Sequence, residues 1–222
     1  MEYSLETLKT KFEIPKNFEI NVEASGGNKL IFHQDKQQAD IEIGQNDELL
    51  AMIAKIKMGL LNPLLATYYY FQKDIAEKEV KYANAFISLV SPLLDAWEMK
   101  TINKYAPDLI MQELKDIADM MKNFDKLKKA GAIKRDNNSE KRIYISLWTM
   151  AHALKMTDLI KIEILYFFDN TEQWEQYLKT LRKLAVQEPD PYLLPKLPDA
   201  AQADYAVKVI DKPYWYFEVK EK

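Results

Sequence analysis

The spacing of apolar residues changes period close to residue 46, and this change constrains the fold more than any other feature of the chain. Over residues 17–44 apolar and polar side chains alternate, which is the period of a half-buried strand. Turn-forming residues at 25–28 and 35–38 divide this stretch into three strands, which predict a small antiparallel meander. A meander with one apolar face needs a helix or a second sheet to cover it.

From Asp47 onward, apolar residues recur every three or four positions, which is the period of an amphipathic helix. The segments that carry such stripes are 49–60, 64–90, 110–124, 159–168 and 174–184. Asn62-Pro63 combines a helix cap with a proline suited to the first turn, and Ser91-Pro92 repeats this pattern. We therefore expect a separate short helix from Ser91, carrying Leu94 and Trp97.

The composition changes again after Glu188. Five prolines between Pro189 and Pro213 predict an extended surface segment, and the aromatic run from Tyr214 to Val219 predicts a terminal strand. We expect this strand to join the N-terminal meander.

The predicted fold is α+β and mostly α-helical, with a bundle-like helical body and a small antiparallel sheet. We expect one compact domain in three parts. These are a β-rich segment (1–46), the helical body (47–188), and the proline-rich segment with the C-terminal strand (189–222).

The composition excludes several classes of catalytic machinery. Five glycines, none of them spaced as in a phosphate loop, leave no dinucleotide fingerprint and no nucleophile elbow. Without cysteine there is no thiol nucleophile and no Cys-based zinc site. The sequence predicts no metal, no cofactor and no enzymatic activity. A net charge of −3, acids near the N-terminus and no apolar run of spanning length predict a soluble, cytoplasmic protein with no membrane partner.

The spacing of the histidines and of three acidic residues indicates structural roles for them. His152 has no carboxylate three or four residues away, and His33 lies on a predicted strand. Asp116 and Asp119 share a helix face but match no metal-binding spacing, and Glu163 stands alone among apolar neighbours. An active site built from carboxylates ranks third among the functional hypotheses.

Residues 122–142 form the one strongly basic segment, with eight basic and three acidic side chains. From residue 122 onward the chain contains, in this order, a basic helix end, Gly131, the turn 136–139 and the alternating stretch 142–147. This order resembles the recognition helix and wing of winged-helix regulators of the MarR type, although no turn divides the helix upstream. The resemblance implies DNA binding. The implied nucleic-acid contacts are Lys128, Lys129, Lys134, Arg135 and Arg142.

The same segment also fits a second prediction. Ile143, Leu147, Met150 and Leu154 are spaced as one stripe of a helix that would begin at Ser139. The sequence leaves the hairpin and the helix as open alternatives for residues 132–147.

Two aromatic runs supply more rings than one core face can bury. Successive helical residues turn by about 100°, so the run Tyr68 to Phe71 cannot point all its rings the same way. We therefore predict that Tyr69, Tyr70 and, in the C-terminal run, Trp215 contact a partner, because exposed Tyr and Trp are enriched in binding hot spots. The leading functional hypothesis is a non-enzymatic protein-binding module that neutralises or scaffolds another protein, as an immunity protein, antitoxin or inhibitor does. The alternative is a winged-helix nucleic-acid-binding regulator.

Overall fold

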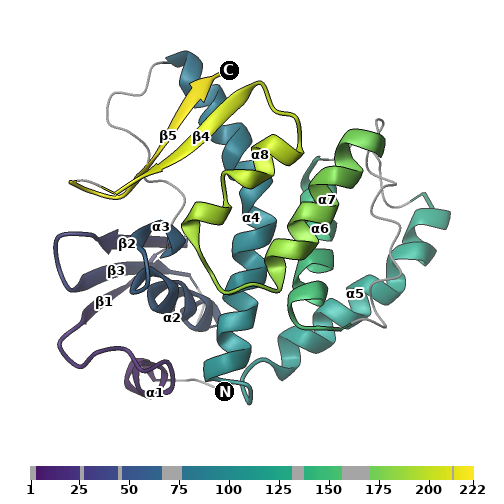
Figure 1. Ribbon diagram of the computed structural model, residues 1–222. Helices are drawn as coiled ribbons and strands as arrows, with labels where there is room; N and C mark the ends of the chain where they lie inside the picture. Colours follow the sequence, from purple (N-terminus) through teal and green to yellow (C-terminus); the bar gives the residue numbers. More distant parts are fainter. Residues whose placement is uncertain are drawn as a thin grey trace.

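A long helix, α4 (Glu77–Tyr105), forms the centre of the protein (Figure 1). The computed structural model describes residues 4–25, 28–44, 47–66, 77–131, 138–156, 171–211 and 213–222. The other helices in these ranges are α1 (Leu5–Lys11), α2 (Asp47–Gly59), α3 (Pro63–Ala66), α5 (Met111–Lys129), α6 (Asn138–Ala153), α7 (Thr171–Ala185), the 3-10 helix η3 (Pro191–Leu193) and α8 (Lys196–Ala200). α4 packs against α2, α6, α7, α8 and the C-terminal strand. The mostly helical α+β fold is confirmed.

The N-terminal sheet has its third strand in the centre. β1 (Glu19–Ala24) lies parallel to β3 (Gln38–Ile43), and β2 (Lys29–His33) pairs antiparallel with the other side of β3. The predicted meander order is therefore wrong. Alternation identifies a strand but not its neighbour. In the central position β3 buries the side chains of Ala39 and Ile41, whereas most of β1 is exposed.

The C-terminal strand lies in a second sheet. β5 (Tyr216–Glu221) pairs antiparallel with β4 (Tyr205–Ile210), so the predicted union with the N-terminal strands is wrong. A partner a few residues away costs less loop-closure entropy than one near the start of the chain. The prediction of an extended segment after Pro189 is also wrong in part, because η3, α8 and β4 all form there.

The Gln34 side chain links the two sheets. Gln34, in the turn after β2, accepts a hydrogen bond from the Trp215 backbone N–H through Oε1 at 2.7 Å. Its Nε2 donates to the Trp215 carbonyl oxygen, also at 2.7 Å. The amide of Gln34 thus satisfies both backbone groups of Trp215, as a neighbouring strand residue would.

Pro92 lies inside α4, so the predicted helix start at Ser91-Pro92 is wrong. Proline in a helix interior removes a hydrogen bond and costs about 3 kcal/mol. Every residue from 90 to 94 is buried, including Val90 and Leu93. Burying one such apolar side chain contributes about 1.5–3 kcal/mol, so burial here outweighs the local cost of the proline.

Helix α6 tests the two predictions for residues 132–147 from residue 138 onward, since residues 132–137 lie outside the described residues. Its range begins at Asn138, so residues 142–147 are helical and the predicted wing strand is wrong. Tyr144 on α6 packs edge-on against Phe124 of α5, with ring centroids 4.7 Å apart. Burial of α6 against both α4 and α5 favours the helical conformation, although Ile143 of the predicted stripe is exposed. Gly131 follows α5 at a φ of 67°, the left-handed conformation expected after a helix.

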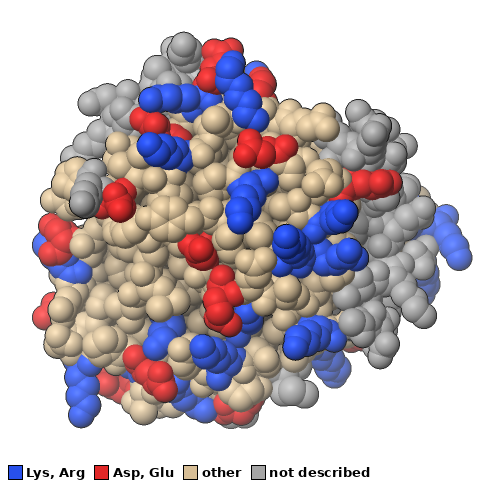
Figure 2. Space-filling view, viewed as in Figure 1, with Lys and Arg blue, Asp and Glu red and all other residues tan. Residues whose placement is uncertain are grey.

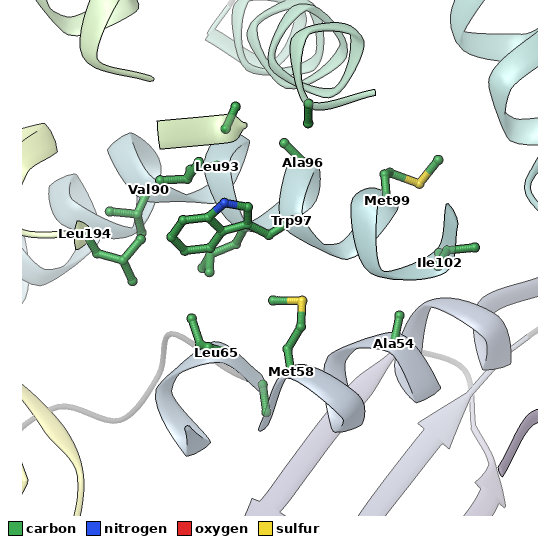
Figure 3. Packing of buried hydrophobic residues seen from close by; sticks show 14 of the residues in the cluster. Ala54, Met58, Leu65, Val90, Leu93, Ala96, Trp97, Met99, Ile102 and Leu194 are labelled. Atoms are coloured by element: carbon green, nitrogen blue, oxygen red, sulfur yellow. The ribbon is translucent and has the colours of Figure 1, made fainter. Parts of the chain in front are cut away.

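Trp97 fills the core where α4 meets α2 and α3. Its side chain is fully buried, and the indole N–H donates to the Leu184 carbonyl oxygen at 3.2 Å. Figure 3 shows the indole surrounded by side chains that include Met58, Leu65 and Leu194. One residue therefore joins the helical body, the α2–α3 region and the segment after α7.

We expect Gly59→Ala to destabilise the protein by about 1–3 kcal/mol, although alanine is the better helix former. A Cβ at position 59 would lie 2.6 Å from the Ala66 Cβ and 2.8 Å from Cε2 of Phe32. Overpacking costs about 1–3 kcal/mol, occasionally more, and contacts this short place the cost at the upper end, above the roughly 1 kcal/mol that alanine gains in helix propensity. Urea denaturation measures the difference. Gly131→Ala is the comparison variant. A Cβ at position 131 would meet no atom within 4 Å, so this variant reports the cost of backbone strain without a steric clash. A variant at position 59 more stable than the parent would contradict the prediction.

Candidate functional site

Two aromatic rings in contact, Tyr192 and Trp215, lie on the C-terminal part of the chain. We call them, together with the exposed chain neighbour Tyr214, the aromatic patch. The exposed fractions of Tyr192 and Tyr214 are 52% and 55%, and Trp215 is half-buried. The rings of Tyr192 and Trp215 meet edge to face with centroids 6.2 Å apart.

The backbone beneath the patch is held from both sides. Asp190 accepts a hydrogen bond from the Tyr192 backbone N–H at 3.0 Å, and Pro191 between them is buried. The Trp215 backbone is held by the hydrogen bond that its N–H donates to Gln34 and by the one that its carbonyl oxygen accepts from Gln34. The turn between β2 and β3 and the start of β5 lie on the same side of the molecule (Figure 1). The rings therefore project from backbone that is already ordered.

Trp215 is the one predicted partner contact that the structure describes. Tyr69 and Tyr70 lie outside the described residues. Tyr192 was not predicted from the sequence. The sequence does contain a local signal for Tyr192. Asp190-Pro191 is a helix cap followed by a proline, which indicates an ordered turn directly before this residue.

The predicted nucleic-acid contacts do not form a winged-helix arrangement in the described part of the chain. Lys128 is half-buried and Lys129 exposed at the end of α5, while Arg142 is exposed on α6. Lys134 and Arg135 lie outside the described residues. With residues 142–147 helical, the segment lacks the strand on which a wing would be built.

A cluster of ionisable groups lies where α2, α4 and α6 meet. Ser146 donates a hydrogen bond to the Asp95 carboxylate at 2.8 Å. The Lys55 ammonium lies 3.4 Å from the Glu98 carboxylate, whose side chain is 13% exposed. Burial raises the pKa of Glu98 to about 7 despite the attraction of Lys55, and burial also raises the pKa of Asp95. This cluster was not predicted, because its members come from three separate helices.

The outer face of the N-terminal sheet carries a network around Asp40. His33 Nε2 lies 2.7 Å from the Asp40 carboxylate, and Asn21 donates to the same group at 2.8 Å. Gln38 donates at 3.0 Å. The hydrogen bond with His33, and those from Gln38 and Asn21, hold the pKa of Asp40 well below its usual range. The network links three strands, which gives His33 a structural role.

The second histidine and the predicted acidic residues have simple surroundings where they are described. His152 Nδ1 lies 2.9 Å from the Trp148 carbonyl oxygen, and burial lowers the pKa of the imidazole. Asp119 is exposed on α5, whereas the Asp116 side chain and Glu163 lie outside the description. Among the side chains the structure describes, no group of three or more His, Asp and Glu is arranged to hold a metal ion.

No protein-family model, no curated protein and no solved structure matches this chain. None of the helices in the described ranges has both the length and the apolar character needed to cross a membrane.

Proposed function

We propose that this chain is a non-enzymatic protein-binding module that neutralises or scaffolds another protein, as an immunity protein, an antitoxin or an inhibitor does. The observation that carries the proposal is the aromatic patch. Tyr192, more than half exposed, contacts the half-buried Trp215, and both residues extend from hydrogen-bonded backbone. Tyr214, also more than half exposed, precedes Trp215 in the chain. Tyr and Trp dominate the hot spots of protein–protein interfaces.

The rigidity of this surface is as relevant as its composition. Ordering a loop when a partner binds consumes part of the binding free energy. The Asp190 cap and the Gln34 amide order the two backbone segments before any partner arrives. A tyrosine has few rotatable bonds, so it provides a large contact area at a small entropic cost. These features favour a contact surface over a chance exposure of aromatic rings.

We expect Tyr192→Ala to weaken partner binding by about 2 kcal/mol, roughly 30-fold in Kd, with little change in stability. The physical reason is the loss of an exposed ring that contacts the partner and rests on Trp215. The partner would first be captured with the wild-type chain from cells that make it, and then purified. Its Kd for each variant would be measured by calorimetry.

Met120→Ala is the matched control, because Met120 is also an exposed apolar side chain but lies on α5, away from the patch. We expect this variant to bind the partner with wild-type affinity. Equal Kd values for Tyr192→Ala, Met120→Ala and the wild type would refute the patch as the contact surface. A loss of affinity in Tyr192→Ala accompanied by a lower unfolding midpoint would also contradict the proposal.

A further inference from the structure

A polar groove lies between α7 and α8, away from the residues of the aromatic patch. Its volume is about 660 Å³, within the range of ligand-binding clefts. Lys179, Thr180 and Lys183 line it from α7, and Lys196 and Asp199 line it from the α8 side. Figure 2 shows basic side chains gathered on the face where Figure 1 places α7.

The charge of this groove is positive. Lys179, Lys183 and Lys196 are all exposed, and no ion pair between described residues engages any of them. The one acidic side chain in the lining, Asp199, is already compensated by the Lys222 ammonium at 3.1 Å. Three ammonium groups are therefore left facing one hollow in a chain whose net charge is −3.

The kinds of side chain in the groove narrow the class of ligand. Lysine acts as a compact point charge with three donors, which suits phosphate oxygens. Arginine, whose planar fork would hold one carboxylate or one phosphate bidentately, does not line the groove, so its positive charge comes from separate ammonium groups that can each contact a different anionic group. The Thr180 hydroxyl and the Gln176 amide add neutral donors beside the lysines. We infer that the α7–α8 groove binds a small anion that carries several phosphate groups.

The lysines are placed to contact such an anion together. Lys179 and Lys183 are four residues apart on α7 and share one face of the helix. Lys196 approaches from the opposite wall. A chain of linked phosphates would receive charge from both walls at once, whereas a single sulfate would reach fewer of the three groups.

The test is calorimetric titration of the full chain with inorganic tripolyphosphate, repeated with the variants Lys183→Gln and Arg182→Gln. Both changes remove one positive charge from adjacent exposed positions of α7, but Arg182 does not line the groove. We expect Lys183→Gln to weaken binding roughly tenfold, the value of one charge-assisted hydrogen bond. With the two variants compared in about 0.15 M salt, Arg182→Gln should stay within about twofold, because an exposed charge outside the groove is screened there over roughly 8 Å.

Three results would overturn the inference. The first is an absence of measurable binding at low salt. The second is an equal loss of affinity in both variants, which would show general charge attraction rather than a site. The third is that a short duplex DNA binds more tightly than tripolyphosphate and loses the same affinity in Lys183→Gln. This result would assign the groove to a nucleic acid. Tripolyphosphate binding that exceeds sulfate binding and falls in Lys183→Gln alone supports the inference.

Discussion

Replacing Trp97 with alanine is expected to lower the free energy of unfolding by about 4 kcal/mol, the largest effect of any single substitution we consider. The side chain is fully buried at the meeting point of several elements, so its removal leaves a cavity that the surrounding helices cannot close (Figure 3). The Leu184 carbonyl oxygen also loses its indole donor. Since a domain of this size is stable by about 5–15 kcal/mol, the loss is a large part of the total.

Urea denaturation followed by far-ultraviolet circular dichroism measures this change. Trp97→Phe keeps most of the apolar volume but removes the N–H, so we expect an intermediate loss and a folded protein. Trp215→Ala is the matched control for deleting an indole, because Trp215 is only half-buried. If Trp97→Ala unfolded at the same urea concentration as Trp215→Ala, the central role of Trp97 would be refuted.

The sequence predicts where strands and helices lie better than how they pair. Each strand of the N-terminal sheet has the alternation expected of it, yet this alternation does not predict the order β1-β3-β2, because the apolar faces of β1 and β3 are alike in sequence. The same limit applies to β5. Its aromatic run identifies a strand, but its partner β4 lies within a segment whose prolines suggested no regular structure.

Local signals mislead where tertiary burial is strong. Ser91-Pro92 has the residues of a helix start, and it would be one on an exposed surface. Inside α4 the burial of Val90 and Leu93 outweighs the proline. The segment 142–147 illustrates the same effect, because it fits a strand and a helix equally well in isolation. Contact between Tyr144 and Phe124 on a neighbouring helix favours the helix.

The candidate sites depend on residues that the chain brings together from a distance. Trp215 was predicted from its aromatic run, but its partner ring Tyr192 comes from a separate turn. The lysines of the groove come from α7 and α8, and neither segment shows in its own sequence that they line one groove. The basic segment 122–142, by contrast, has the highest local charge in sequence, yet the arrangement that would make it a winged helix is absent from its described residues.

The contribution of Glu98 to the stability of the protein should fall as the pH rises from about 4.5 to about 7. Glutamate has an unperturbed pKa of 4.5, and burial raises the pKa of Glu98 to about 7 in the folded state. Between these values the folded state keeps a proton that the unfolded state releases, so raising the pH favours unfolding. The retained proton contributes about 3 kcal/mol at most to the free energy of unfolding, and this contribution is fully lost above pH 7. Asp95, whose pKa burial also raises, acts in the same direction.

We therefore expect Glu98→Gln to flatten this pH dependence and to raise the stability at pH 8 by up to about 3 kcal/mol. The amide resembles the protonated carboxyl in shape and carries no charge to desolvate. Lys55 loses an ion-pair partner, but its side chain is one-third exposed and stays solvated. Urea midpoints measured across this pH window test the prediction. Glu188→Gln is the matched control, because Glu188 also pairs with a lysine but its side chain is 75% exposed, and such surface pairs contribute little. If Glu98→Gln kept the pH dependence of the wild type, Glu98 would not be the group that retains its proton when the protein folds.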